Sequence, residues 1–330
     1  MLKNTKKFKE AFYRIQEAKK ILLITHVRPD GDALASVGAF IDLIIGLDKE
    51  YVAYCQDEPA PSFLFLPHIE KISSNREKII ADFFSFDLII TLDCANADRT
   101  GLADEIKKRQ VDQFFIEIDH HPENDDQIDL EIRDDKTIAT AEIIYYFFKA
   151  NNIKINKNTA NCLLAGILGD SGNFLYPGIS DKTVNIASEM LLLGAQLPQI
   201  LKNTLQNKSL SAMKLWGLVL NNLQVNKKYN LAFSALTLDE ISRFDNDEDT
   251  FDSISGFLSN LYGVKAVIFL REENNSLTGV RQVKGSLRTS HPTLDISKLA
   301  NKLGGGGHAK ASGFVLAGSI EKKGNSWRIM

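Results

Sequence analysis

Residues 21–32 read ILLITHVRPDGD, an apolar run that ends at His26 and leads into Asp30 and Asp32. A continuous apolar run of this kind is typical of a parallel strand that is buried on both faces. In open α/β sheets, binding and catalytic groups gather at the carboxyl ends of the strands. We therefore expect His26, Asp30 and Asp32 to share one crevice at the edge of a largely parallel sheet. Asp32 would also cap the helix that follows.

The residue types in this stretch suit a divalent metal ion. Imidazole binds Mn, Fe, Co or Zn, carboxylates bind Mg or Mn, and a mixed set favours a borderline ion. Gly31 permits a tight turn that aims the two aspartates at neighbouring points. A turn held by an Asx hydrogen bond is the ordinary structural alternative for Asp-Gly-Asp. The metal interpretation therefore depends on partners elsewhere in the chain.

Later segments repeat this design. One apolar run ends at Asp93, and another ends in Asp119-His120-His121. Burying unpaired charges in a hydrophobic core is costly, so these residues do not serve packing. Parallel strands would bring them to the same edge of the sheet. Asp170 is a further candidate, because a predicted helix ends there and continues into glycine-containing sequence.

Each of these residues has an expected role. Asp93 would bridge two ions, because paired metals are held about 3.5–4 Å apart by such shared groups. A turn residue is the structural alternative for Asp93. Of the adjacent His120 and His121, one can ligate a metal while its neighbour faces the substrate. Asp119 would orient a ligand imidazole through its other ring nitrogen.

A chain of 330 residues predicts two domains. The expected fold class is α/β, with helices flanking the largely parallel sheet of an N-terminal domain. We place this metal-binding catalytic domain at 1–193, a polar and weakly periodic connector at 194–209, and a smaller α/β substrate-binding domain at 210–330. The active site would lie in the cleft between the two domains.

The composition restricts the partners and the compartment. A net charge of −3 argues against binding long duplex nucleic acid, which requires many neutralised phosphates. The cysteines Cys55, Cys94 and Cys162 form no CxxC pair, which argues against a disulfide framework and favours a reducing cytoplasm. No apolar run reaches the length of a membrane span. We expect a soluble, cytoplasmic protein without membrane contacts.

Residues 304–307 are four consecutive glycines followed by His308. A flexible linker is the commonest meaning of such a run. Here it lies between a predicted helix and a predicted strand, and glycine lets backbone N–H groups approach an anion without a Cβ in the way. We favour an anion site with Arg288 as a bidentate partner. Four aspartates would neutralise two divalent cations, so His121, His308 and Lys310 would also help to attract an anionic substrate.

Together these residues resemble the DHH phosphoesterase family, named after the triplet that stands here as Asp119-His120-His121. The other signatures follow the family order, as His26-x3-Asp30-x-Asp32, Asp93 and Asp170. The glycine run with His308, preceded by Arg288, resembles the DHH-associated C-terminal domain. This domain type marks the branch that contains oligoribonucleases (nano-RNases) and 3′-phosphoadenosine 5′-phosphate (pAp) phosphatases. The resemblance covers nearly the whole chain.

The resemblance implies two divalent cations, Mn²⁺ first and Mg²⁺ or Co²⁺ as alternatives. One ion would be held by His26, Asp30 and Asp93, and the other by Asp32, Asp93, His120 and Asp170. Asp93 and His121 would have catalytic roles, with His121 in contact with the substrate phosphate. The terminal phosphate or base would be held by Arg288, Gly306, Gly307 and His308.

The implied activity is that of a metal-dependent phosphodiesterase, a hydrolase that acts on short RNA or on linear or cyclic dinucleotides. It would release mononucleotides and also remove a phosphate from pAp. The glycine-rich motif makes pyrophosphate a less favoured substrate. The alternatives are a phosphatase for small non-nucleotide phosphates and a non-catalytic nucleotide-binding module. The sequence leaves a homodimer open.

Overall fold

The structure is a computed structural model that describes residues 4–122, 127–176, 178–245, 248–275, 278–323 and 326–330. The chain divides into two compact units, Met1–Asn207 and Lys208–Met330, which are described separately. The division falls within the predicted connector 194–209, which contains helix α8 (Leu197–Thr204). Among the described residues, no helix combines the length and the hydropathy needed to cross a lipid bilayer.

The first unit contains a six-stranded parallel sheet in the order β3-β2-β1-β4-β5-β6. In this order the chain proceeds to one side from β1 and to the other side from β4. The carboxyl ends of β1 and β4 therefore form the switch point at which open α/β sheets bind ligands. The strands are β1 (Lys20–Ile24), β2 (Glu50–Tyr54), β3 (Ile72–Ser73), β4 (Leu88–Leu92), β5 (Phe114–Asp119) and β6 (Leu130–Arg133).

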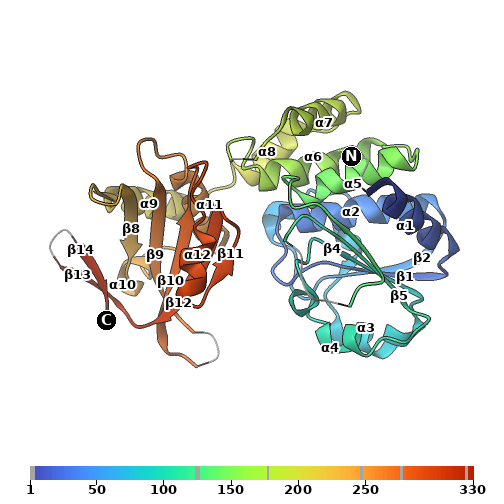
Figure 1. Ribbon diagram of the computed structural model, residues 1–330, viewed down its shortest axis with the longest axis horizontal. Coiled ribbons are helices and arrows are strands. Elements are labelled where there is room, and N and C mark those ends of the chain that lie inside the picture. Colours follow the sequence, from blue (N-terminus) through green and yellow to red (C-terminus); the bar gives the residue numbers. More distant parts are fainter. Residues whose placement is uncertain (1–3, 123–126, 177, 246–247, 276–277, 324–325) are drawn as a thin grey trace. The chain divides into compact units, whose positions relative to one another are not determined.

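Helices cover both faces of this parallel sheet (Figure 1). Alternate residues of one strand serve two separate cores: Leu23 of β1 belongs to one and Leu22 to the other. The larger core lies under α1 (Thr5–Glu17), α2 (Gly31–Gly46), α5 (Thr140–Ala150) and α6 (Lys157–Asp170), with α7 (Asp181–Leu192) packed on α6. The smaller core lies under α3 (Arg76–Asp82) and α4 (Ala103–Lys107).

The packing of α2 against α6 positions the site. An added Cβ at Gly38, in the middle of α2, would lie 2.9 Å from Cys162 Sγ. An added Cβ at Gly169, near the end of α6, would lie 3.9 Å from the Gly31 Cα at the start of α2. The two helices are therefore antiparallel, and the end of α6 meets the start of α2.

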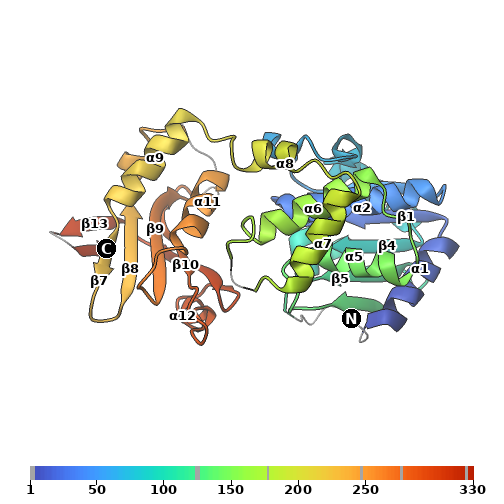
Figure 2. The ribbon, with the colours of Figure 1, turned by 90° about the horizontal axis from the view of Figure 1, so that it is seen from above.

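The second unit contains a mixed six-stranded sheet in the order β11-β12-β10-β9-β8-β7, in which β8 and β9 pair in parallel and the other described pairs are antiparallel. In Figure 2, α9 and α11 lie on one side of these strands and α12 on the other. The strands are β7 (Gln224–Asn226), β8 (Leu231–Leu236), β9 (Ala266–Asn274), β10 (Arg281–Arg288), β11 (Gly306–Gly307) and β12 (Ala311–Ala317). The helices are α9 (Leu210–Asn221), α10 (Leu238–Ile241), α11 (Glu248–Leu258) and α12 (Ser297–Lys302), and a hairpin follows, β13 (Ile320–Lys323) with β14 (Ser326–Ile329).

This architecture confirms the predicted fold class, a largely parallel sheet flanked by helices and a smaller second α/β unit. The catalytic and substrate-binding roles of the two units, and a site in a cleft between them, stay predictions.

Candidate metal centre

His26 lies just beyond β1 and is 3% exposed. Its Nδ1 atom is 2.8 Å from the carbonyl oxygen of Val27. Because a carbonyl oxygen can only accept, Nδ1 is the donor in this contact, and Nε2 is the ring nitrogen left to face the site. Nε2 lies 3.7 Å from Oδ2 of Asp30 and 4.0 Å from Oδ2 of Asp93. The local fold thus aims the metal-binding nitrogen of His26 at two carboxylates.

Asp30, and not Asp32, caps α2. Its Oδ1 atom accepts hydrogen bonds from the backbone N–H groups of Asp32 at 3.1 Å and Ala33 at 3.0 Å. This corrects the expectation that Asp32 is the cap. Because Oδ1 serves the helix, it is Oδ2 of Asp30 that faces His26.

Asp32 is fully buried in the first turn of α2. Its carboxylate accepts hydrogen bonds from the backbone N–H groups of Thr140 at 2.6 Å and Ala141 at 3.0 Å. These groups open α5, and the N-terminus of a helix stabilises a negative charge. The start of α5 therefore holds the Asp32 carboxylate in place at the start of α2.

Asp93 directly follows β4 and is buried, with a φ of 62°. Left-handed backbone is uncommon for a non-glycine residue and often marks a functional site. Its Oδ1 atom accepts a hydrogen bond from the Thr140 hydroxyl at 2.9 Å and lies 3.5 Å from Nε2 of His120. Its Oδ2 atom faces His26. The two oxygens of Asp93 thus point toward different histidines, as a bridging carboxylate requires.

Asp170 is the last residue of α6, and its Oδ2 atom lies 3.2 Å from Nε2 of His120. The chain turns sharply after it, because Gly172, Asn173 and Phe174 all have left-handed backbone with φ between 54° and 65°. The Ser171 hydroxyl accepts a hydrogen bond from the Phe174 N–H at 3.0 Å. This turn lets α6 end at the site with its final carboxylate directed at His120.

Among the residues that the structure describes, three overlapping groups of possible ligand atoms result, and within each group all atoms lie within 4.8 Å of one another. The groups are His26–Asp30–Asp93, Asp32–His120–Asp170 and Asp93–His120–His121. The first matches the set predicted for one ion. The second contains three of the four residues predicted for the other ion, and the fourth, Asp93, faces His120. The structure therefore brings the predicted ligands together, while their assignment to bound ions stays a prediction.

Three of the four predicted ligand carboxylates, those of Asp32, Asp93 and Asp170, resist ionisation in the protein alone. At Asp30 burial also raises the pKa, but the hydrogen bond and charge of His26 outweigh it and hold the pKa below its ordinary value. Burial, and after it the charge of Asp30, raises the pKa of Asp32 to about 7. Burial, and after it the charges of Asp32 and Asp30, raises the pKa of Asp93 and of Asp170 well above the ordinary value. Like charges this close cannot ionise together without a counter-charge. Divalent cations supply that charge, and these oxygen and imidazole donors suit them, so the residues fit a pair of divalent ions.

Asp119 orients His121. Oδ1 of Asp119 accepts hydrogen bonds from the backbone N–H of His121 at 2.7 Å and from its Nδ1 at 2.8 Å. Oδ2 accepts one from the N–H of Ala95 at 2.6 Å. Burial raises the pKa of Asp119, but the hydrogen bond and charge of His121 outweigh it and hold the pKa below its ordinary value. Asp119 therefore positions His121, the histidine that was predicted to face the substrate.

The glycine run lies in the second unit, where its shape is set by packing. A Cβ at Gly305 would lie 2.0 Å from the carbonyl oxygen of Gly313, and one at Gly307, with φ +126°, would lie 2.7 Å from that of Ala311. Glycine is needed here because β11 approaches β12 closely, so the run is no flexible linker. Gly306 is exposed, and an added Cβ there would make only an ordinary contact, 3.7 Å from Oδ1 of Asn301.

The cationic residues near this run differ in their contacts. Arg288 ends β10 and donates through Nη1 to the carbonyl oxygen of Leu287 at 2.9 Å. Lys310 donates to three carbonyl oxygens, those of His291, Pro292 and Leu294, at 2.6–3.1 Å. Because an ammonium has three donors, this corrects the expectation that Lys310 is available to an anion. The roles of Arg288, Gly306, Gly307 and His308 in substrate binding stay predictions.

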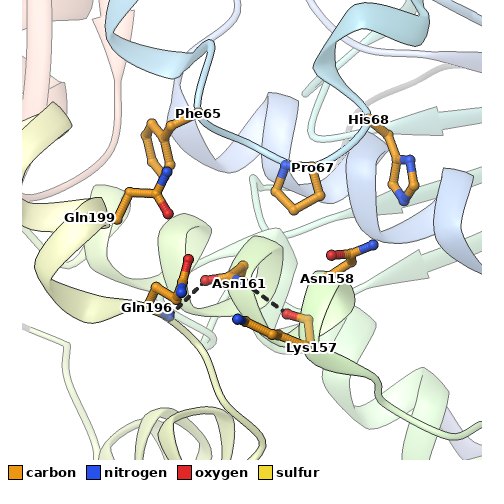
Figure 3. A pocket seen from close by; sticks show the side chains of 8 residues that line it. All are labelled: Phe65, Pro67, His68, Lys157, Asn158, Asn161, Gln196 and Gln199. Carbon is orange, nitrogen blue, oxygen red and sulfur yellow. Dashed lines mark hydrogen bonds between the residues drawn. The ribbon is translucent and has the colours of Figure 1, made fainter.

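A separate cavity of about 380 Å³ lies at the N-terminal end of α6, the end opposite to Asp170 (Figure 3). Asn161 spans one side of it, accepting from the N–H of Gln196 at 2.7 Å and donating to the carbonyl oxygen of Lys157 at 3.0 Å. Its lining contains no residue of the metal-ligand set. The lining residues are Phe65, Pro67, His68, Lys157, Asn158, Asn161, Gln196 and Gln199.

The sequence interpretation missed two residues that shape this centre. Thr140 supplies an N–H to Asp32 and a hydroxyl to Asp93, and its position at the start of a helix, with small residues on both sides, was the available signal. Arg133 ends β6 and is buried beside the Asp119-His120-His121 segment. The available signal for Arg133 was that it is a charged residue at the end of a strand, which is the feature that identified Asp93 as a candidate.

Comparison with known proteins agrees with these features. Residues 20–167 match the DHH family, N-terminal domain, and residues 229–325 match the DHHA1 domain. A bifunctional oligoribonuclease and PAP phosphatase NrnA from Bacillus subtilis is 28% identical, covering 89% of this chain and 88% of the relative. The NrnA of Thermus thermophilus is 30% identical, covering 90% and 84%. A crystal structure of an exopolyphosphatase-related protein from Bacteroides fragilis is 25% identical with a TM-score of 0.85, covering 94% and 90%.

Proposed function

Because this chain belongs to the DHH family, we propose that it is a metal-dependent phosphodiesterase that hydrolyses short oligoribonucleotides to mononucleotides and removes a phosphate from pAp. The observation that carries this proposal is the convergence of carboxylates and imidazoles from β1, β4, β5 and α6 at one sheet edge. The names of the relatives from B. subtilis and T. thermophilus support the choice of substrates. Linear and cyclic dinucleotides belong to the same chemical class.

In the proposed site, His26, Asp30 and Asp93 hold one cation, and Asp32, Asp93, His120 and Asp170 hold the other. Mn²⁺ is the expected ion, with Mg²⁺ or Co²⁺ as alternatives. When bound, such a pair lowers the pKa of a water and withdraws charge from the phosphoryl oxygens. The chain itself supplies a rigid arrangement of donors, because Thr140 and Ala141 fix Asp32 and Thr140 also fixes Asp93.

His121 provides a group for the substrate rather than for an ion. Because its Nδ1 is bonded to Asp119, its remaining nitrogen, Nε2, is the one that would meet the phosphate. Arg288, Gly306, Gly307 and His308 of the second unit would bind the terminal phosphate or base. A substrate with a nucleotide at each end of the scissile bond would use both sets of residues.

A second candidate is a phosphatase for inorganic or other non-nucleotide phosphates. The likeness to the B. fragilis structure, described as exopolyphosphatase-related, favours testing it. A non-catalytic nucleotide-binding module is less favoured, because the predicted metal ligands converge instead of being scattered.

The test is a comparison of initial rates with Mn²⁺ on pAp, pApA, a five-nucleotide RNA, pyrophosphate and polyphosphate. The proposal expects turnover of the first three and little of the last two. Asp93→Asn should lower turnover by about 100-fold or more, whereas Asp82→Asn, at an exposed residue that ends α3, should leave it unchanged. Turnover of polyphosphate alone would favour the second candidate, and binding of pApA without turnover would favour the non-catalytic module.

A further inference from the structure

Arg133 is a buried arginine whose five donors are all used. Its side chain is 4% exposed at the end of β6, where it is in register with Asp119 of β5. Nε donates to Glu131 at 2.7 Å, Nη1 donates to the carbonyl oxygens of His121 and Pro122 at 2.9 Å each, and Nη2 donates to Glu117 and to the carbonyl oxygen of Ala95 at 3.5 Å. A guanidinium has five N–H groups, so each has an acceptor.

These contacts exceed what a counter-ion needs. Glu117 is 1% exposed, and a buried carboxylate requires a positively charged partner. The single ammonium group of a lysine would be enough for this role. Apart from the bond to the Glu131 side chain, the other hydrogen bonds of Arg133 go to backbone carbonyl oxygens on two loops. Ala95 belongs to the loop that follows β4 and Asp93, and His121 and Pro122 belong to the loop that follows β5. Arg133 therefore ties together the two loops that carry the central carboxylate and the predicted substrate histidine.

His121 is consequently held from both of its backbone polar groups. Its N–H and its Nδ1 are bonded to Oδ1 of Asp119, and its carbonyl oxygen is bonded to Arg133. Asp119 is itself bonded to the Ala95 N–H, and Arg133 is bonded to the Ala95 carbonyl oxygen. The planar guanidinium can serve these separate directions at once because its donors form a rigid fork, which a lysine lacks.

We propose that Arg133 is a positioning residue for phosphoester hydrolysis, which fixes the place of the His121 imidazole by holding the carbonyl oxygens of His121, Pro122 and Ala95. This inference rests on the proposed function for its kinetic part. A displacement of about 1 Å in a catalytic group can lower a rate by about 100-fold. The loss is expected in kcat more than in KM, because the residue acts on the geometry of His121 and not on substrate binding in the second unit.

The decisive variant separates the counter-ion role from the positioning role. Arg133→Met alone takes the guanidinium away from the buried Glu117 carboxylate, and it is expected to lower the melting temperature. The double variant Glu117→Gln with Arg133→Met removes both charges and should restore the melting temperature. Arg133→Lys keeps a charge beside Glu117 but loses the fork, so it provides a second folded variant. Arg109→Met is the matched control, because Arg109 is also largely buried but lies near Phe115 at the opposite end of β5.

The proposal expects the folded double variant and Arg133→Lys to bind Mn²⁺ like the wild type while kcat on pApA falls about 100-fold. Arg109→Met should keep kcat within about threefold of the wild type. Wild-type kcat in the double variant, at a restored melting temperature, would show that Arg133 only neutralises Glu117 and would overturn the proposal.

A second readout needs no substrate. In ¹⁵N-histidine NMR spectra, with His121→Gln used for assignment, the hydrogen-bonded Nδ1–H of His121 should be visible in the wild type and in Arg109→Met. It should be lost or shifted in the double variant and in Arg133→Lys. An unchanged signal in both would contradict the positioning role even if the wild type hydrolysed no phosphoester, so failure of this inference and failure of the proposed function remain distinguishable.

Discussion

The Nε2 atom of His120 lies 3.2 Å from the Oδ2 atom of Asp170, although one residue follows strand β5 and the other ends helix α6. An imidazole nitrogen and a carboxylate oxygen that face each other in this way, with Asp32 in the same group, have the chemistry of a metal site. A substitution in this pair is therefore the most direct test of whether this edge of the sheet binds two ions or one.

Asp170→Asn should remove one of two Mn²⁺ sites. Asparagine keeps the size of the side chain but has one carbonyl oxygen and no charge, so the His26–Asp30–Asp93 group should still bind an ion. Isothermal titration should give two Mn²⁺ ions per chain for the wild type and one for the variant. Asp82→Asn is the control and should still bind two. A variant that kept both ions at wild-type affinity would remove Asp170 from the ligand set.

The stability of the metal-free protein should fall as the pH rises from 5 to 8. The pKa of Asp32 is raised from 3.8 to about 7 in the folded protein, and those of Asp93 and Asp170 are raised as well. A carboxyl with a raised folded-state pKa contributes stability below its unfolded value, and this stability is lost as the pH rises through the folded value. Asp30 and Asp119, whose pKa values are lowered, lose their contributions only below about pH 4 and do not alter this window.

Melting curves in the presence of a chelator check this expectation, and Asp32→Asn should flatten the slope. Mn²⁺ should reverse the trend, because it binds the ionised carboxylates and therefore stabilises the folded state more at pH 8 than at pH 5. A melting temperature that rose with pH without metal would contradict the assignment of these carboxyls as electrostatically crowded.

Gly166→Ala should weaken metal binding through Asp32. An added Cβ on this α6 residue would lie 2.4 Å from Oδ1 of Asp32 and 2.7 Å from Cβ of Ala141. Alanine favours a helix over glycine by about 1 kcal/mol, so any loss comes from the displaced carboxylate and its hydrogen bonds. The affinity for Mn²⁺ is expected to fall about tenfold or more. Gly217→Ala in α9 has nothing within 4 Å of its added Cβ, so it should leave the affinity unchanged and raise the melting temperature slightly.

How far the sequence predicts this centre depends on the range of the contacts involved. His26 and Asp93 could be paired in advance, because each follows an apolar run and parallel strands end at one edge. The placement of Asp32 against α5 could not be predicted, because it depends on how the start of α5 docks on α2. The cap of α2 is Asp30 instead of the predicted Asp32, and this too is beyond the sequence, because both are good capping residues and only the backbone geometry distinguishes them.

The second unit shows a different limit of the sequence. A glycine run indicates that Cβ atoms are excluded, but not what excludes them. At Gly305 the neighbour is the strand β12, and the pattern alone could not separate this from an anion that approaches the backbone. Lys310 followed the same run and was expected to face an anion, yet its ammonium is bonded to three carbonyl oxygens of the loop at 291–294.

Two glycine variants can separate packing from substrate contact in this run. At Gly305 an added Cβ would lie 2.0 Å from the carbonyl oxygen of Gly313 and 2.6 Å from Cα of Phe314, both backbone atoms that cannot move aside cheaply. Gly305→Ala should therefore destabilise the second unit by a few kcal/mol, the order of magnitude for overpacking. At Gly306 the nearest atom is Oδ1 of Asn301 at 3.7 Å, so Gly306→Ala should melt like the wild type.

Any kinetic change in Gly306→Ala then reports on the substrate rather than on the fold. If this exposed backbone binds the terminal phosphate or base, the added methyl group should raise KM for pApA by about tenfold, a loss equivalent to about one hydrogen bond, with kcat little changed. Mn²⁺ titration should be unaffected, because the predicted metal ligands all lie in the first unit. A KM equal to that of the wild type, in a variant with a wild-type melting temperature, would remove Gly306 from the substrate site and leave the glycine run with a packing role alone.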